Sequence, residues 1–299
     1  MGFEYLTNVP LAQARKEYLE RLVSGGFGSK TETIPVFESC GRVTAKAVYA
    51  HICAPHYAAS AMDGVAVSAK ETFGATETTP VTLKPDQFLV LDTGDPIPED
   101  KDAVIMVEDI VKNGDGSITI HAAAAPWQHI RQIGEDVCAG EMILPSHMTV
   151  SPAAIGAMIA GGVLEIEVIR KPVVGIIPTG DEIIPPCTDP KPGDILEFNG
   201  SIFSAMVRSW GAEAVVYPIV PDKFDQIKEM VAKAADECDM VILNAGSSAG
   251  REDFSARVIR ELGEVLYHGI AIKPGKPAIL GCRGEKVILG VPGYPVSGI

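Results

Sequence analysis

Two lysines on either side of a proline–glycine pair give the sharpest chemical signal of the sequence, which reads Lys273-Pro274-Gly275-Lys276. Proline followed by glycine is preferred at the centre of a type II turn, which brings the flanking Cα atoms within ~7 Å. Two ammonium groups held that close repel each other, and an oxyanion between them relieves the repulsion. A solvated turn with splayed lysines is the alternative, but after a strand in an acidic protein the pattern favours an anion site.

A loop of small residues, NAGSSAG at 244–250, offers a second place for an anion. Small side chains let backbone N–H groups approach a phosphate, and a helix that follows adds its dipole. The loop is neither a Walker A motif nor a dinucleotide fingerprint. Asp253 begins the next predicted helix, where it is either a helix cap or a catalytic carboxylate.

Acidic residues also follow an apolar run at Thr179-Gly180-Asp181-Glu182. Carboxylates at strand ends can hold Mg²⁺ against a phosphate or act as a general base, whereas the alternative is a tight turn with capping carboxylates. Asp63, which precedes a glycine, and Asp136 are equally compatible with ordinary turns.

The composition bounds the class of protein that carries these residues. With 299 residues, 46% of them hydrophobic and 21% charged, we expect two or three domains around large cores. Lys plus Arg is 25 and Asp plus Glu is 39, which gives a net charge of −14. A surface this acidic repels phosphate backbones and anionic lipid, so we expect neither a nucleic-acid nor a membrane partner.

The cysteines and the N-terminus indicate the compartment. Six cysteines stand without Cys-x-x-Cys or zinc-ligand spacing, which predicts reduced and mostly buried thiols. The N-terminus lacks the pattern of a signal peptide, and the apolar stretch 150–164 is shorter than the ~18 residues of a membrane span. The sequence therefore predicts a cytoplasmic protein.

The order of elements predicts an α/β multidomain protein. A helix is expected at 11–22, short strands and turns over 51–140 predict a small β-rich domain, and Ser151-Pro152 opens another helix. After Pro172, strands alternate with helices, which predicts a three-layer α/β domain with a mostly parallel sheet. Ligands bind at the carboxyl ends of such strands, so the site is expected in loops 178–183, 244–253, 272–277 and 291–297.

Taken in order, seven motifs resemble the molybdopterin molybdenumtransferase family, also called the MoeA or gephyrin E-domain family. They are SAMDGVAV (60–67), DTGDPIP (92–98), IGEDV (133–137), PTGDEI (178–183), GSSAGREDF (246–254), IKPGKPA (272–278) and VPGYPVSG (291–298). Departures from the family's usual residues include Pro178, Asn244 and Tyr294.

The resemblance implies the last step of molybdenum cofactor biosynthesis. Such a transferase inserts molybdate into adenylylated molybdopterin and releases AMP, with Mg²⁺ as the cofactor. A phosphate-cradling loop suits the pterin phosphoanhydride, and paired positive charges suit the molybdate dianion. Dithiolene sulfur is a soft ligand that suits a transition metal.

The resemblance also assigns roles to residues. Lys273 and Lys276 would hold molybdate or phosphate, and Glu182 and Asp253 would bind Mg²⁺ or position water, with Asp63 as a further catalytic carboxylate. The substrate-binding set would be Thr93, Gly94, Asp136, Thr179, Gly180, Asn244, Gly246, Ser248, Gly250, Pro292, Gly293 and Ser297.

The implied architecture has three parts and two subunits. Residues 1–50 plus 142–171 would form an elongated α+β dimerisation domain, 51–141 the β-rich domain and 172–299 the molybdopterin-binding domain. In a homodimer, the β-rich domain would close over the sheet domain of the partner subunit. Upstream molybdopterin-synthesis enzymes would be further partners. Family members continue into a C-terminal β domain, so we expect a truncated chain with low activity.

Two other functions remain open on the sequence. The sheet domain also resembles the adenylyltransferase that makes the adenylylated pterin, although that smaller enzyme lacks the segments 60–67 and 133–137. The chain could instead be a non-catalytic pterin-binding or scaffold module, against which the retained lysines and carboxylates argue.

Overall fold

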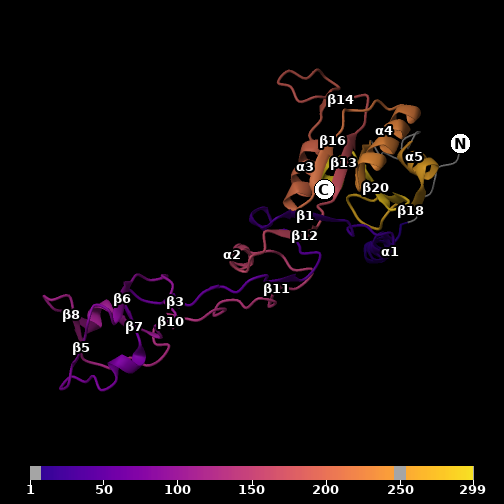
Figure 1. Ribbon diagram of the computed structural model, residues 1–299. Helices are drawn as coiled ribbons and strands as arrows, with labels where there is room; N and C mark the ends of the chain where they lie inside the picture. Colours follow the sequence, from indigo (N-terminus) through magenta and orange to yellow (C-terminus); the bar gives the residue numbers. More distant parts are fainter. Residues whose placement is uncertain (1–7, 246–253, 299) are drawn as a thin grey trace. The chain divides into compact units, whose positions relative to one another are not determined.

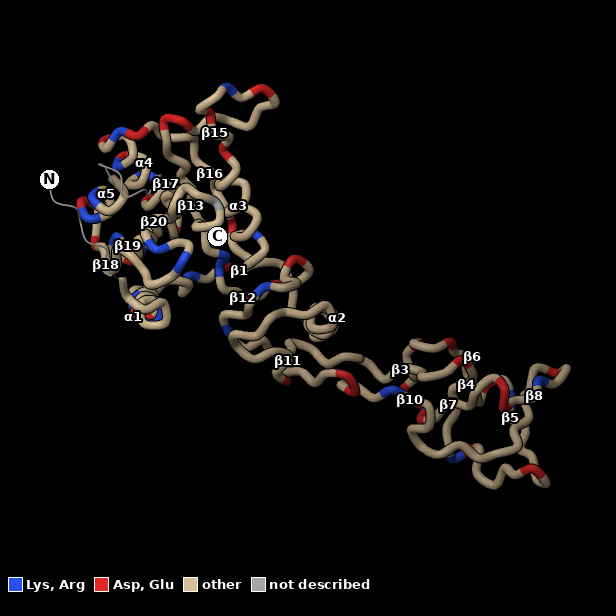
Figure 2. Tube along the Cα trace, turned by 180° about the vertical axis from the view of Figure 1, so that it is seen from behind, with Lys and Arg blue, Asp and Glu red and all other residues tan. Residues whose placement is uncertain are grey.

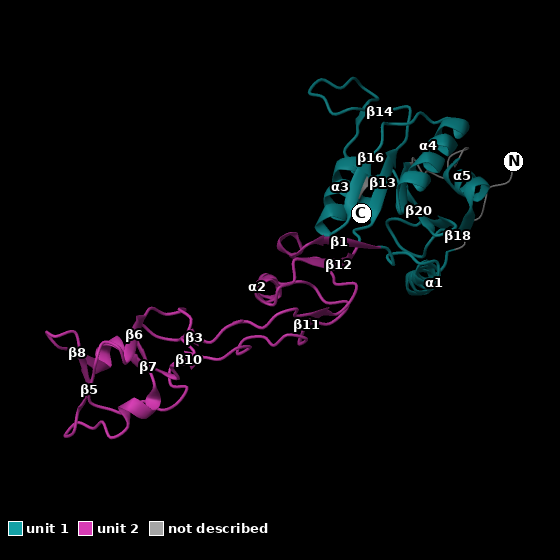
Figure 3. Ribbon diagram, in the orientation of Figure 1, with its two compact units in different colours: residues 1–30, 170–299 teal, residues 31–169 magenta. Residues whose placement is uncertain are grey.

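A computed structural model describes residues 8–245 and 254–298. The chain divides into two compact units, which Figure 3 colours separately. Residues 1–30 and 170–299 form the first, called the sheet unit below, and residues 31–169 form the second, called the middle unit. The chain up to Lys30 thus clusters with the sheet unit, while the three-part division made from the sequence stays a prediction.

A six-stranded sheet organises the sheet unit (Figure 1). Across the sheet the strands are β16 (Glu213–Val216), β13 (Val173–Pro178), β17 (Met240–Ala245), β20 (Lys286–Pro292), β19 (Ile279–Arg283) and β18 (Glu264–His268). The pairs from β16 to β20 are parallel, and β19 runs antiparallel to both of its neighbours. This confirms the predicted mostly parallel sheet, with an antiparallel edge that the sequence did not reveal.

Helices cover both faces of this sheet. The helices of the unit are α1 (Leu11–Ser24), α3 (Asn199–Ser209), α4 (Phe224–Glu237), α5 (Phe254–Leu262) and α6 (Pro295–Gly298). Successive side chains of a strand point to opposite faces. Ile176 therefore packs in the core that contains Phe203 of α3, whereas Ile177 packs in the core that contains Val231 of α4 and Val258 of α5. The result is the expected three-layer arrangement.

Short antiparallel strands and one helix make up the middle unit. It holds two apolar cores, one around Val36, Met158 and Val168 and the other around Val65 and Ile120. The paired strands are β1 (Thr31–Pro35) with β12 (Glu165–Ile169), β2 (Val48–Tyr49) with β11 (Met142–Leu144), β3 (Ala59–Ser60) with β10 (Ile130–Arg131), β4 (Gly64–Val67) between β6 (Phe88–Leu91) and β7 (Ala103–Met106), and β9 (Ile118–Ile120) between β5 (Val81–Leu83) and β8 (Ile110–Lys112).

Helix α2 (Pro152–Ala160) confirms a helix start predicted from sequence. The Ser151 hydroxyl accepts the Ala154 N–H at 3.2 Å, and Pro152 occupies the first helical position. Both features satisfy or remove N–H groups that a helix start leaves without partners.

The cysteine prediction is partly wrong. Cys238 and Cys282 are buried, but Cys40, Cys138 and Cys187 are exposed and Cys53 is half-buried, so the thiols are not mostly buried. Among the helices of residues 8–245 and 254–298, none combines the length and the apolarity that crossing a membrane requires.

One buried carboxylate ties together the two places where the chain passes between the units. Asp239, whose side chain is 13% exposed, accepts the Val173 N–H at 3.0 Å and pairs with Arg170 and with Lys30. The backbone N–H of Arg170 also donates to the Lys30 carbonyl at 2.9 Å. Burial alone would raise the pKa of Asp239, but these donors outweigh it and lower the pKa to about 2.

Replacing this carboxylate should weaken the sheet unit in a pH-dependent way. Asp239→Asn is expected to lower the free energy of unfolding at neutral pH by about 2 kcal/mol. A carboxyl group whose pKa is lower in the folded state stabilises that state at pH values above its unfolded pKa. This stabilisation is lost as the pH falls through the folded pKa. Urea unfolding of the two proteins should therefore converge as the pH falls from about 4 to about 2. The exposed Asp189 provides the control, since Asp189→Asn should change little at any pH.

Candidate functional site

The carboxyl ends of the parallel strands bring three predicted loops to one edge of the sheet. In register, Pro178 at the end of β13 lies beside Asn244 of β17, and Asn244 lies beside Val291 of β20. Because β18 is antiparallel to β19 and β19 is antiparallel to β20, the end of β18 points to the same edge. The lysine segment that follows β18 therefore emerges at this edge too.

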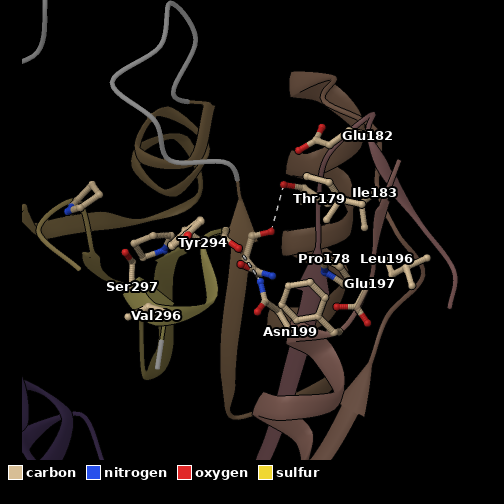
Figure 4. Close-up of a pocket in the computed structure, with 16 residues that line it drawn as sticks. Pro178, Thr179, Glu182, Ile183, Leu196, Glu197, Asn199, Tyr294, Val296 and Ser297 are labelled. Carbon is tan, nitrogen blue, oxygen red and sulfur yellow. Dashed lines mark hydrogen bonds between the residues drawn. The ribbon is translucent and has the colours of Figure 1, made fainter. Parts of the chain in front are cut away.

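A cavity of about 640 Å³ opens at this edge of the sheet unit (Figure 4). Six of the predicted site residues line it: Thr179, Glu182, Asn244, Pro292, Gly293 and Ser297. Its apolar walls come from residues that were not assigned a binding role from the sequence. They are Ile183 and Ile195 of the short parallel pair β14 (Ile183–Ile184) and β15 (Ile195–Leu196), with Leu196, Phe198, Tyr294 and Val296. Apolar walls with a few polar groups are typical of sites that bind small ligands.

Thr179 holds the cavity floor together rather than presenting its hydroxyl. It is 4% exposed, and both its backbone N–H, at 2.9 Å, and its hydroxyl, at 3.3 Å, donate to the carbonyl of Asn244 (Figure 4). Gly180, which follows, donates its N–H to Val220 at 3.1 Å and is not a lining residue. These bonds fix the end of β13 against its neighbours.

Two asparagines place unsatisfied acceptors at the cavity. Asn244 is 6% exposed and Asn199, at the start of α3, is 7% exposed. Within the described ranges, neither Oδ1 atom has a hydrogen-bond partner, although Asn199 Nδ2 donates to the Gly293 carbonyl at 2.8 Å. A buried acceptor without a donor costs roughly 1–3 kcal/mol, so a ligand that supplies N–H groups here would recover that energy.

Asn199 is a functional candidate that the sequence reasoning missed. It follows β15 and begins a helix, so its signal was only that of an asparagine after a strand, a common place for a helix cap. The structure instead uses its amide to hold Gly293 and to line the cavity.

Three carboxylates gather where the segment after β16 runs beside the loop after β13, and one of them, Glu182, lines the cavity. Asp222 donates its backbone N–H to Asp181 Oδ1 at 3.1 Å, and Thr179 forms a parallel bridge with Val220. Burial and then the negative charges of Glu182 and Asp181 raise the pKa of Asp222. Asp222 was not among the residues predicted from the sequence. Acidic residues, drawn in red in Figure 2, predominate on the loops near β15.

This carboxylate group suits a cation that is shared with a ligand. In the described ranges, no set of three or more His, Cys, Asp or Glu side chains has the geometry to hold a metal ion. Mg²⁺ commonly binds through one or two carboxylates plus substrate phosphate oxygens and water. The oxygen donors of Glu182 and Asp222 fit that mode, in which the ligand completes the shell.

The lysine turn differs from the prediction. The backbone hydrogen bond of this segment runs from Ala278 N–H to the Gly275 carbonyl at 3.1 Å, so the turn is centred on Lys276 and Pro277. Among the described residues, no bond joins the Lys276 N–H to the Lys273 carbonyl, as a type II turn at Pro274-Gly275 often has. Both lysines are exposed. Pro277, beside Lys276, lines the cavity, although neither lysine does.

The remaining described site residues lie in the middle unit. Asp63 accepts the Thr93 N–H at 2.6 Å and the Thr93 hydroxyl at 2.7 Å, and these two bonds lower the pKa of Asp63. Gly94 donates its N–H to the Ser60 carbonyl at 2.8 Å. Asp136 is exposed and pairs with Arg131. Asp63 and Thr93 thus form one anchored pair, and Asp136 belongs to a separate ion pair.

Four predicted residues fall outside the described ranges. These are Gly246, Ser248 and Gly250 of the phosphate loop, and Asp253, one of the two expected Mg²⁺ ligands. Their roles stay predictions.

Comparisons with known proteins agree with this geometry. Residues 9–162 match the description "MoeA N-terminal region (domain I and II)", and residues 175–299 match "Probable molybdopterin binding domain". Molybdopterin molybdenumtransferase of Haemophilus influenzae is 32% identical and aligns over 97% of this chain and 74% of its own length. Molybdopterin molybdenumtransferase 2 of Mycobacterium tuberculosis is 33% identical over 89% of this chain and 71% of that protein.

A solved structure extends the match to the fold. The crystal structure of the molybdopterin biosynthesis MoeA protein from Pyrococcus horikoshii has a TM-score of 0.81 at 32% identity, covering 98% of this chain and 76% of that one. The two matched regions and the shared fold define a protein of the molybdopterin biosynthesis class. The chain belongs to the MoeA family.

The charge of Glu182 should influence the ionisation of Asp222. Glu182→Gln removes one of the negative charges that disfavour ionisation of Asp222, so we expect the pKa of Asp222 to fall. Carboxyl NMR titration measures this directly. Glu213→Gln, at the start of the edge strand β16, is the matched control and should leave the pKa of Asp222 unchanged. Equal shifts in the two variants would contradict a specific coupling.

Proposed function

We propose that this protein is a molybdopterin molybdenumtransferase that inserts molybdate into adenylylated molybdopterin with release of AMP. Membership of the MoeA family supports this activity, since the two relatives above carry that name. The observation that carries the proposal is the cavity at the carboxyl edge of the sheet, with apolar walls and two buried acceptors that have no donor among the described residues.

The cavity fits the pterin end of the substrate. A pterin ring is planar and presents an amide N–H beside an exocyclic amino group, and both are donors. The Oδ1 atoms of Asn199 and Asn244 are acceptors that lack donors within the described residues. Placing the ring between the apolar walls would satisfy both atoms, because each would gain a donor in a site shielded from water.

Charged groups around the cavity suit the other parts of the reaction. Glu182 and Asp222 would hold Mg²⁺ together with oxygens of the phosphoanhydride, and the cation would offset the repulsion between the carboxylates. Lys273 and Lys276, at the same edge of the sheet, would bind the molybdate dianion. Mg²⁺ would supply charge neutralisation as the adenylate departs.

The middle unit would complete the site of a second copy of the chain. Asp63 is exposed, and Thr93 fixes its carboxylate in position. Asp136 is exposed as well. In a homodimer these carboxylates would close over the partner's cavity, as the family resemblance implies.

The activity has a defined product test. With adenylylated molybdopterin, Mg²⁺ and molybdate, the protein should release AMP, measured by chromatography. Lys276→Ala should weaken the apparent molybdate affinity by roughly 1.5–3 kcal/mol, which is about tenfold to a hundredfold. Lys233→Ala, at an exposed lysine of α4, should match the unchanged protein.

Two outcomes would overturn parts of this proposal. Consumption of ATP with release of pyrophosphate would assign the protein to adenylyl transfer instead. Mixing Asp63→Asn with Lys276→Ala tests the composite site, because a mixed dimer would contain one site with neither substitution. Failure of the mixture to exceed both parents would place all the required residues within one chain.

Asn199 should govern recognition of the pterin. Asn199→Ala removes one acceptor, so pterin affinity should fall by about 0.5–1.5 kcal/mol, or up to about tenfold. Quenching of pterin fluorescence measures the binding. Lumazine, which carries a carbonyl in place of the amino donor, should bind the unchanged protein more weakly, and Asn199→Ala should reduce this preference.

The control for this substitution lies on the same helix. Ser204 is buried in α3 and does not line the cavity, so Ser204→Ala should preserve the preference for pterin over lumazine. Loss of the preference in Ser204→Ala alone would show that helix stability, rather than the Asn199 acceptor, sets the recognition.

A further inference from the structure

Two cysteines far apart in the sequence face each other in the middle unit. Ala54 and Val137 form an antiparallel bridge, in which the Ala54 N–H donates to the Val137 carbonyl at 2.8 Å and the Val137 N–H donates back at 3.1 Å. Cys53 precedes Ala54 and Cys138 follows Val137, so the antiparallel register places the two cysteines directly opposite one another.

The type of pairing matters for the distance between their side chains. Residues 54 and 137 exchange both backbone hydrogen bonds, so the next pair along, Cys53 and Cys138, is of the kind that exchanges none. Such pairs bring their Cα atoms to about 4.5 Å, with the side chains close together. That separation falls within the range of about 4.4–6.8 Å found across disulfides.

The positions of the sulfur atoms agree with the register. A Cβ atom built on Gly134 would lie 2.9 Å from Cys138 Sγ and 3.5 Å from Cys53 Sγ, so the two sulfurs border the same small space. Cys138 Sγ donates to the Gly134 carbonyl at 3.3 Å, and the Ala139 N–H donates to Cys53 Sγ at 3.4 Å. Gly134 thus leaves room for both sulfurs and keeps them on one side of the paired segments.

Small reagents can reach this pair. Cys138 is exposed and Cys53 is half-buried, whereas Cys238 and Cys282 are buried in the sheet unit. Access and an adjacent second thiol are the two features that favour exchange with a disulfide over inert burial.

We propose that Cys53 and Cys138 form a reversible cross-strand disulfide site that exchanges with low-molecular-weight disulfides such as oxidised glutathione. The thiolate of Cys138 attacks one sulfur of the small disulfide, whose S–S bond breaks and releases one thiolate. The Cys53 thiolate then attacks Cys138 Sγ, the protein S–S bond forms, and the second small thiolate leaves. The protein pair loses two electrons, the small disulfide gains them, and the two protein protons pass to the released thiols.

The bond would join two segments that connect the cores of the middle unit. Residues 50–58 run between β2 and β3, and residues 132–141 run between β10 and β11. One of these segments carries Asp136, whose N–H donates to the Ala54 carbonyl at 2.9 Å. Oxidation therefore adds a covalent link next to this backbone pairing, close in sequence to that carboxylate. This inference is independent of the molybdenum chemistry proposed above.

The experiment uses the full chain incubated with oxidised glutathione. In the unchanged protein, Cys53 and Cys138 should both lose their free thiols, retain no glutathione and yield a Cys53–Cys138 cross-linked peptide in mass spectrometry. Excess reduced glutathione should restore both thiols. In Cys53→Ser the second attack is impossible, so Cys138 should keep one glutathione.

A variant with the exposed Cys40 and Cys187 both changed to serine is the matched control and should still form the cross-link. Glutathione retained on both Cys53 and Cys138 without a link would overturn the proposal. So would a link that forms only between two chains, seen as loss of the product on dilution.

Discussion

The parallel register of β13, β17 and β20 is the constraint on which the site depends. Parallel pairing forces the strands to end at a common edge, so Pro178, Asn244 and Val291 align although they are far apart in the sequence. The double donation from Thr179 to the Asn244 carbonyl then locks this alignment where the strands stop. A slip of one residue would turn the Asn244 side chain to the other face of the sheet.

Electrostatics adds a second layer to this geometry. The chain carries a net charge of −14, and three of its carboxylates, Asp181, Glu182 and Asp222, lie close together where Glu182 reaches the cavity. These carboxylates would repel an anionic substrate unless a cation bound between them. We therefore expect the substrate and a cation to bind together. Exposed lysines at the same edge of the sheet carry positive charge. Together, the carboxylates and the lysines would favour a ligand that carries a phosphate and binds with a metal ion.

Rules about strands and their ends predicted much of the fold and part of the site. Thr179, Asn244 and Gly293 lie in loops that were expected to carry ligands because they follow strands of a mostly parallel sheet, and the family resemblance assigned these residues to the substrate. Asn199 and Asp222 were missed because their roles arise from contacts with Gly293 and Asp181 that only the folded chain creates. The turn near Lys276 was misplaced by two residues, since several turns compete within a segment rich in proline and glycine.

The interactions of Asp239 with Lys30 and Arg170 have a consequence for how a protein of this architecture could arise in evolution. Lys30 and Arg170 are neighbours through a backbone hydrogen bond, and the segment before Lys30 belongs to the sheet unit, where the buried Tyr18 hydroxyl of α1 donates to the Gly281 carbonyl of β19 at 2.9 Å. Residues 31–169 therefore have the topology of a domain insertion, whose ends leave and rejoin the host at one point. An ancestral chain could have gained this module by a single recombination event at a surface turn, without rewiring the host sheet.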